Sequence, residues 1–151
     1  MSRNDFEEWA HSTGSILNED SDTYTLQLFG DSSIVCPKSD ESVTPCLVRD
    51  GMWEAWISLW FMNNIDKDTT FIDVGANCGY YSVLALRECF NVYAFEPNPI
   101  YIELLQETAQ LNNSDCMYTL PYAVSDREET VTLYVPGADL ASASVIGEVN
   151  T

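Results

Sequence analysis

Two carboxylates and two glycines near the middle of the chain have the spacing of a nucleotide-cofactor site. The segment from Phe71 to Ser82 reads F-I-D-V-G-A-N-C-G-Y-Y-S, so a short apolar strand ends in an acid and a turn with two glycines opens a helix. Asp73 precedes that turn, and Gly75 and Gly79 flank it. Glycine permits positive φ and lets a ligand approach the backbone. The segment therefore predicts a loop that holds a nucleotide cofactor at the end of a strand.

The residues around this loop narrow the choice of cofactor. A phosphate-binding P-loop needs Gly-Lys-Ser/Thr after the turn, and a dinucleotide loop reads G-x-G-x-x-G. Neither pattern occurs, which argues against a nicotinamide-dependent oxidoreductase. An acid at Asp73 disfavours a pyrophosphate but suits a cofactor with an ammonium and a sulfonium, which is S-adenosylmethionine. Glu96 ends a second predicted strand and can accept hydrogen bonds from both hydroxyls of a ribose. Each acid alone is also explained as an exposed carboxylate at a strand end.

A doubly wound, Rossmann-like α/β sheet is expected to position these residues. Strands alternating with helices give right-handed parallel crossovers, and the ligand then lies beyond the carboxyl ends of the strands. The expected elements are strands at Thr70–Val74, Asn91–Phe95, Met117–Val124 and Thr130–Val135, and helices at Tyr80–Glu88 and from Asn98 to Asn112. We expect the first of these strands to be buried on both faces. The tail after residue 135 shows no clear element.

Two regions are expected ahead of this unit. Residues 1–22 are polar and acidic, and we expect a flexible arm that is frayed or partly helical. Residues 23–49 are predicted to be a small β layer, with strands at Thr23–Leu28, at Ile34–Cys36 and at Cys46–Val48. Residues 50–151 then contain the cofactor loop.

A helix from Met52 to Met62 is expected just before the first strand of that unit, and it carries three tryptophans. Trp53, Trp56 and Trp60 follow one another at helical spacing. They are compatible with stacking on a ligand, but an apolar stripe packed on a sheet explains them more simply.

Composition excludes several classes of function. The 151 residues include 6 Lys plus Arg against 24 Asp plus Glu, a formal net charge of −18. Such a surface repels a phosphate backbone and an anionic membrane, so we expect neither nucleic acid nor membrane as a partner. Five cysteines without a C-x-x-C pair and a single histidine, His11, give no metal-site spacing. No apolar stretch reaches the roughly 20 residues of a membrane span. These features predict a cytoplasmic protein without a metal.

The motifs resemble those of a known family. D-V-G-A-N-C-G-Y-Y-S is similar to the first motif of the FkbM-type methyltransferases, a class I S-adenosylmethionine-dependent family. V-Y-A-F-E-P-N-P resembles the second motif, and A-V-S-D-R-E-E-T-V-T-L-Y resembles the region of the third strand. The resemblance covers roughly residues 50 to 147, and G-M-W-E-A-W at its start is a weaker match. It implies that residues 50–151 are the N-terminal half of a methyltransferase domain.

The resemblance also implies a role for each matched position. The implied cofactor-binding residues are Asp73 for the methionyl end, Gly75, Ala76, Asn77 and Gly79 for the loop beneath it, Glu96 for the ribose, Pro97 and Asn98 for the border of the adenine, and Val124 or its neighbours for backbone contacts to the adenine edge. Glu54, near the mouth of the loop, is a weaker candidate for the amino-acid end, because a carboxylate at a helix start also explains it. No catalytic base is identified.

The chain departs from this family after the third strand. A class I sheet has seven strands, and the acidic D-x-E-G stretch of the fourth has no counterpart here. The strand at Thr70 is then expected at a sheet edge with unpaired backbone, and one wall of the cofactor crevice is missing. This predicts either the N-terminal piece of a methyltransferase or a reduced relative that self-associates or is completed by a partner chain.

Two functions therefore remain open. The first is methyl transfer from S-adenosylmethionine to a small-molecule acceptor, an oxygen of a sugar or natural product. The second is a partial or catalytically inactive module that binds the cofactor or a partner without chemistry.

Overall fold

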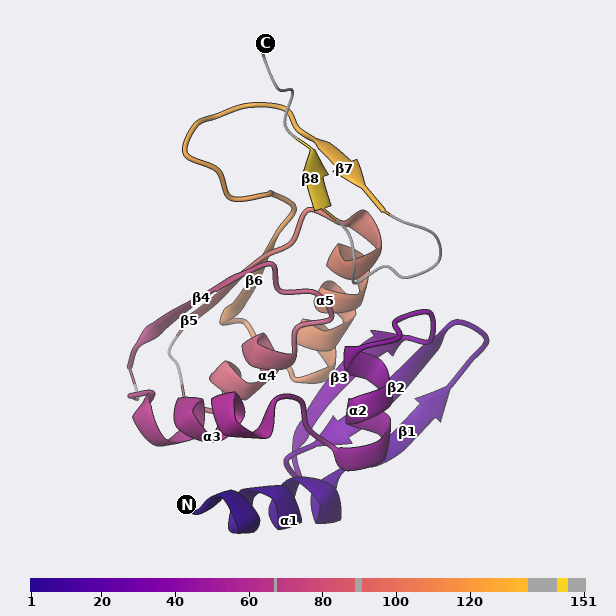
Figure 1. Ribbon diagram of the computed structural model, residues 1–151, viewed down its shortest axis with the longest axis vertical. Coiled ribbons are helices and arrows are strands. Elements are labelled where there is room, and N and C mark those ends of the chain that lie inside the picture. The colour runs from indigo at the N-terminus through magenta and orange to yellow at the C-terminus, as the bar shows by residue number, and fades with distance from the viewer. Residues whose placement is uncertain (67, 89–90, 136–143, 147–151) are drawn as a thin grey trace.

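The computed structural model describes residues 1–66, 68–88, 91–135 and 144–146, which form helices and three separate sheets (Figure 1). The elements in chain order are α1 (Arg3–Thr13), β1 (Ser15–Glu19), β2 (Thr23–Leu28), β3 (Ser32–Pro37), α2 (Val43–Asp50), α3 (Ala55–Asn64), β4 (Thr70–Val74), α4 (Tyr80–Leu86), β5 (Asn91–Phe95), α5 (Pro99–Leu111), β6 (Met117–Leu120), β7 (Thr132–Tyr134) and β8 (Ser144–Ile146).

The expected parallel unit is present. Strands β4, β5 and β6 pair in parallel in that order, and α4 and α5 make the two crossovers. The side chain of Asn98 caps α5 by accepting from the backbone N–H of Ile100 at 3.1 Å, and Pro99 takes the first helical position. The third strand ends at Leu120, earlier than expected, because Pro121 has no N–H for the ladder.

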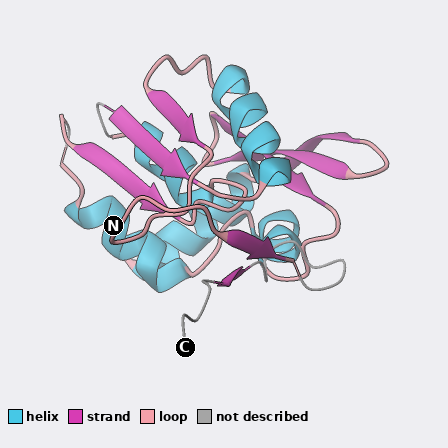
Figure 2. Ribbon diagram, turned by 90° about the horizontal axis from the view of Figure 1, so that it is seen from above, coloured by secondary structure: helices cyan, strands magenta, loops and turns pink. Residues whose placement is uncertain are grey.

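The helices α4 and α5 lie between the parallel sheet and the antiparallel sheet β1-β2-β3 (Figure 1). Seen from above, helices separate two groups of strands (Figure 2). Polar contacts fix the outer sheet to α5, since the backbone N–H of Val35 donates to Thr108 Oγ1 at 3.0 Å and Asn112 bonds both backbone groups of Ser33. The predicted cofactor loop therefore leads directly into α4, a helix that contacts strands of both sheets.

Residues 1–22 are ordered, so the flexible arm expected there is wrong. Residues 3–13 form α1, which starts at a capping box between Ser2 and Asp5 and buries Phe6 completely. The Phe6 ring packs against Trp9 and Phe29. Residues 15–19 then pair with β2 as an edge strand. The partly helical alternative is therefore observed and the flexible arm is not. Because only Phe6 and Ala10 of α1 are buried, the sequence has few regular apolar positions that would mark the helix.

The strand expected at Cys46–Val48 is also wrong, because these residues belong to helix α2. The buried carboxylate of Asp40 accepts hydrogen bonds from the backbone N–H groups of Ser42, Val43 and Thr44. These bonds satisfy the free donors of a first helical turn, so local capping outweighs a three-residue apolar run. In the tail, where no element was expected, β8 pairs antiparallel with β7.

The two faces of the parallel sheet differ sharply. Paired residues of the strands share a face, and the row Phe71, Val92 and Met117 faces α4 and α5. On the other face Ile72 is 59% exposed and Val74 is 60% exposed. The expectation that β4 is buried on both faces is therefore wrong, whereas its expected place at an edge of the sheet is observed.

In the described part of the chain no helix is long and apolar enough to span a membrane.

Candidate functional site

A pocket of about 200 Å³ lies at the carboxyl end of β4. It brings together four of the nine cofactor-binding residues expected from the sequence and adds five others. The lining residues are Asp73, Gly75, Ala76 and Asn77, together with Val43, Trp53, Cys78, Tyr80 and Tyr81. Gly79, Glu96, Pro97, Asn98 and Val124 do not line it.

The Asp73 carboxylate is the charged group of this pocket. Its Oδ2 atom accepts a hydrogen bond from Ser82 Oγ at 2.7 Å. Burial raises the pKa of Asp73 above its ordinary value, and the hydrogen bond from Ser82 opposes that shift. Among the described residues that line the pocket none is basic, and three are aromatic. The site therefore offers a carboxylate and π-faces, which is chemistry that attracts a cation.

The two glycines of the loop serve different purposes. Gly75 has φ of 77°, and a Cβ added there would meet no atom within 4 Å, so its backbone faces open space at the pocket. Gly79 has φ of 91°, and a Cβ there would lie 2.5 Å from Leu105 Cδ2 on α5. Gly75 thus leaves room for a ligand, whereas Gly79 lets the start of α4 pack against α5.

Glu96 holds the loop in place. It is 6% exposed, and its two carboxylate oxygens accept from the backbone N–H groups of Asn77 and Asn98, each at 2.9 Å. The loop is also tied to β5, because the N–H groups of Gly75 and Ala76 both donate to the carbonyl of Phe95. The carboxylate expected to bind a ribose therefore already joins the predicted cofactor loop to the N-cap residue of α5 by these two hydrogen bonds.

The donors of the loop are used within the protein. Besides these bonds, the N–H of Cys78 donates to the Asn77 side chain and that of Gly79 to the carbonyl of Ala76. The resemblance implies that backbone groups of this loop contact the amino-acid end of a cofactor. The backbone N–H groups of residues 75–79, however, already donate to acceptors within the protein. Its shape, more than its free donors, defines the pocket.

The remaining expected residues lie around the end of β5 and beyond β6. Asn98 is 2% exposed and serves as the cap of α5, Pro97 is half-buried, and Val124 is exposed. None of them forms part of the pocket with Asp73.

Sequence reasoning missed most of the wall opposite Asp73. Tyr81 Oη donates to Glu54 Oε2 at 2.8 Å, which places the carboxylate of Glu54 beside the pocket. Tyr80 Oη lies 2.9 Å from Ser58 Oγ and so joins α4 to α3. The pair Tyr80-Tyr81 directly follows Gly79, so its position in the motif was a usable signal. Val43 gave none, because it lies far away in the sequence.

The three tryptophans divide between two surroundings. Trp53 precedes α3 and lines the pocket, whereas Trp56 is 63% and Trp60 64% exposed on α3. The expected stripe packed on a sheet is therefore wrong for these two rings. Phe61, on another side of α3, packs edge-on against Phe71 of β4.

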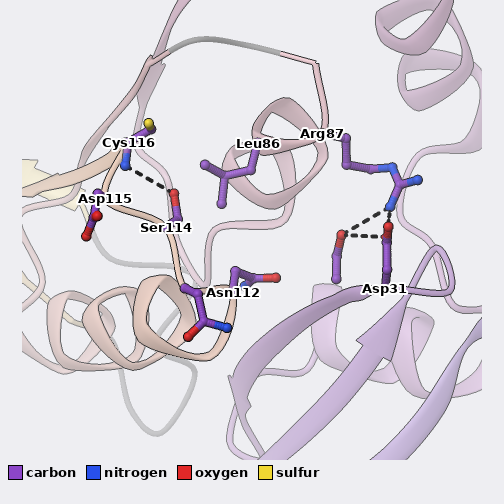
Figure 3. A pocket seen from close by; sticks show the side chains of 9 residues that line it. Asp31, Leu86, Arg87, Asn112, Ser114, Asp115 and Cys116 are labelled. Carbon is purple, nitrogen blue, oxygen red and sulfur yellow. Dashed lines mark hydrogen bonds and ion pairs between the residues drawn. The ribbon is translucent and has the colours of Figure 1, made fainter.

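A larger cavity of about 480 Å³ has Asp31, Leu86, Arg87 and Asn112 among its lining residues (Figure 3). It is bounded by the ends of α4 and α5 and by the turn before β3. Its guanidinium, Arg87, already bonds Asp31, Ser32 Oγ and the carbonyl of Phe29. Ligands of parallel sheets bind at the carboxyl ends of the strands, so this cavity is not the site that the motif predicts. In the described residues no cluster of three or more His, Cys, Asp or Glu could hold a metal.

Comparison with solved structures identifies the fold. The structure of M. jannaschii TYW2 in complex with AdoMet matches 70% of this chain and 46% of that chain, with a TM-score of 0.52 and 17% identity. The structure of P. horikoshii TYW2 in complex with MeSAdo matches 77% of this chain and 41% of that chain, with a TM-score of 0.51 and 18% identity. The structure of a SAM-dependent methyltransferase from Agrobacterium tumefaciens matches 71% of this chain and 34% of that chain, with a TM-score of 0.51 and 13% identity. The chain has a Rossmann-like methyltransferase fold.

The match is partial in length. This chain spans less than half of each of these three proteins. No protein-family model and no curated protein matches the chain. The likeness therefore concerns the fold, and the FkbM type is not confirmed.

Proposed function

We propose that the chain binds S-adenosylmethionine at the loop from Asp73 to Gly79 and forms part of a methyl-transfer site of the FkbM type. The observation that carries this proposal is the pocket at the end of β4, where a half-buried carboxylate and aromatic rings stand without a basic lining residue. A sulfonium and an ammonium complement such a pocket. The open space at Gly75 leaves room for the cofactor to approach the backbone.

Each residue of the site has a proposed task. Asp73 holds the methionyl end, and the carboxylate of Glu96 accepts from the ribose with lone pairs that the loop does not use. Pro97 and Asn98 border the adenine, and Val124 lies at its outer edge. The complex of M. jannaschii TYW2 with AdoMet shows that a protein of similar fold binds this cofactor, which supports the assignment.

The cofactor supplies an electrophilic methyl group, and the chain aligns an acceptor with it. We propose an oxygen of a sugar or other small molecule as the acceptor, since a net charge of −18 opposes the approach of a nucleic acid. His11, the single histidine, lies on α1 and does not line the pocket. No described residue is thus assigned as the base.

A second function rests on the size of the pocket. Sites that enclose a cofactor-sized ligand have volumes of roughly 300–1,000 Å³, and this pocket has about 200 Å³. A module that binds S-adenosylmethionine weakly, without turnover, agrees with that volume. Catalysis would then require a further wall, either from a longer methyltransferase of which this chain is a piece or from a partner chain.

Titration calorimetry separates these functions. We expect S-adenosylmethionine and S-adenosylhomocysteine to bind, and Asp73→Asn to weaken binding more than tenfold. Asp115→Asn, in the distant cavity, is the matched control and should leave the affinity unchanged. NAD serves as the comparison for a nicotinamide enzyme, and thermal stability reports any ligand that binds only the folded chain. Binding of NAD but not of S-adenosylmethionine would refute the proposal. Turnover on a simple acceptor would eliminate the non-catalytic module.

A further inference from the structure

Two tyrosine rings at the start of α4 form a corner in the pocket that contains Asp73. Tyr80 and Tyr81 both line the pocket, their ring centroids lie 5.2 Å apart, and their planes meet at 76°. Trp53 adds a third ring, and among the described lining residues Asp73 is the only charged one. Aromatic rings at steep angles beside a carboxylate resemble the cages in which proteins hold methylated ammonium groups.

The hydrogen-bonding groups of this corner are already in use. Tyr80 Oη lies 2.9 Å from Ser58 Oγ, and Tyr81 Oη donates to Glu54 Oε2 at 2.8 Å. The backbone N–H groups of residues 75–79 also donate to acceptors within the protein. The corner therefore presents ring surface beside a carboxylate, and these donors are not left for a ligand.

The three rings contribute unequally to that surface. Tyr80 is 3% exposed, whereas Tyr81 and Trp53 are half-buried and so give a ligand most of its contact area. The pocket volume of about 200 Å³ is below the roughly 300–1,000 Å³ of sites that enclose drug-sized ligands, so it suits a head group.

Such a lining selects its ligand by charge. The carboxylate repels an anion, and the ring faces attract a cation without any hydrogen bond. A methylated sulfonium or ammonium has no N–H or O–H donor, so its burial beside rings leaves no hydrogen bond unmade. A neutral group of the same shape gains only the apolar contact.

We propose that this corner recognises a methylated cation by its charge, either the sulfonium of S-adenosylmethionine or the trimethylammonium group of a small molecule. Tyr81 and Trp53 supply the ring surface, and Asp73 supplies the opposite charge. The sulfonium part rests on the proposed function, whereas the small-cation part does not depend on it.

Recognition by charge distinguishes the two forms of the cofactor. In methyl transfer the methyl carbon bonds to the acceptor oxygen, the electron pair of the carbon–sulfur bond stays on sulfur, and the proton of the acceptor passes to water. S-adenosylhomocysteine therefore keeps the shape of the cofactor but lacks the charge that the corner binds. We expect it to bind about fivefold more weakly or less tightly still, which favours its replacement by fresh cofactor.

Titration calorimetry on the chain tests the sulfonium part, in 0.15 M NaCl so that the net charge is screened beyond about 8 Å. Tyr81→Leu and Trp53→Leu should each weaken S-adenosylmethionine and remove most of its preference over S-adenosylhomocysteine. The unchanged affinity for S-adenosylhomocysteine then shows that each variant is folded. Tyr81→Phe retains the ring and should retain the preference. Tyr118→Leu removes a ring of β6 that does not line the pocket and is the matched control.

Choline tests the small-cation part against its neutral isostere, in which a tert-butyl group replaces the trimethylammonium group. In an NMR titration we expect choline to bind with a dissociation constant on the order of 1 mM and the isostere to bind at least about fivefold more weakly. Choline should also compete with S-adenosylmethionine. Tyr81→Leu should weaken choline, and Tyr118→Leu should not.

The outcomes separate this inference from the proposed function. Equal affinities for both cofactor forms, with choline no better than its isostere, would overturn the inference and leave the proposed function intact. Binding of choline but of neither cofactor form would support the corner as a small-cation site and contradict the proposed function. A preference for S-adenosylmethionine without choline binding identifies the sulfonium as the cation recognised. Selection by charge that survives both Tyr81→Leu and Trp53→Leu would overturn the assignment to these rings.

Discussion

The two faces of the parallel sheet have similar sequences and opposite surroundings. Val92 and Ala94, which face the helices, are fully buried, whereas Ile72 and Val74, on the opposite face that we call the bare face, are more than half exposed. An apolar side chain in a strand therefore does not tell which face is covered. The handedness of the crossovers decides that, because it directs both helices to the same side.

The covered face also carries the chemistry. Among the residues of β4, β5 and β6 the single charged side chain is Asp73, and it lies on the side of α4. Burial disfavours the charged form of this carboxylate, and the group is compatible with the proposed role of Asp73 in binding a cation. The covered face is thus both the core and the support of the pocket.

The largest difference between the faces should appear in stability. Leu105→Ala removes a fully buried side chain that packs under the loop, and we expect a loss of about 2–5 kcal/mol in the free energy of unfolding. Ile72→Ala on the bare face should change it by no more than about 0.5 kcal/mol in the monomer. Urea unfolding in 20 mM NaCl measures both. Equal losses would mean that the bare face is covered in the isolated chain.

The two glycines provide a smaller comparison within the loop. Gly79→Ala adds a methyl group 2.5 Å from Leu105 Cδ2 at a positive φ, and we expect it to cost about 2–4 kcal/mol. Gly75→Ala meets no neighbour, so it should cost about 1–2 kcal/mol from its positive φ alone. Its larger effect should be on cofactor affinity, because the methyl group enters the pocket. If Gly79→Ala proves the milder change, the packing of α4 on α5 differs from that described.

Asp73 should show opposite effects on stability and on binding. Burial raises its pKa, so the folded chain takes up the proton more readily than the unfolded chain. The stabilisation from that proton is complete below the ordinary value of 3.8 and is lost as the pH rises through the higher folded-state pKa. Asp73→Asn should therefore be more stable than the wild type at pH 7 and not at pH 3. Thermal melts at the two pH values measure this. A variant that is less stable at pH 7 would show that the carboxylate stabilises the fold.

The smallest expected effect concerns Glu54, at the rim of the pocket. If its carboxylate binds the ammonium of the cofactor, Glu54→Gln should weaken S-adenosylhomocysteine by a factor of about five or less, because the group is exposed. Methylthioadenosine, which lacks the amino-acid end, should bind both forms equally. Calorimetry with the two ligands measures the difference, and Asp115→Asn, an exposed acid in the other cavity, is the control. An equal loss for both ligands would assign Glu54 to the shape of the rim.

Much of the fold was readable from local sequence. The strands β4 and β5 begin and end where expected, because short apolar runs end at Gly75 and Glu96-Pro97. Asn98 and Pro99 predicted the start of α5 for the same reason, since a cap and a first-turn proline act within a few residues. The acid and glycines of the loop likewise lie within one turn, so their proximity is fixed by the chain itself.

Contacts between distant segments were not readable. Val43 reaches the pocket from the start of α2 and Trp53 from the turn before α3, and no local pattern records that. Helix α1 likewise depends on the packing of the Phe6 ring against Phe29, which lies in the turn after β2. Such contacts join residues whose separation in sequence carries no periodic signal.

By itself the sequence determined an acidic α/β chain with a carboxylate-glycine loop at the end of a parallel strand. Only the tertiary structure decided that Glu96 binds two backbone N–H groups around this loop, that aromatic rings from α4 and from the turn before α3 line its pocket, and that no described element covers one apolar face of the sheet. The reason is physical: strands, caps and tight turns depend on neighbours in the chain, whereas burial and the partners of a carboxylate depend on how the elements pack.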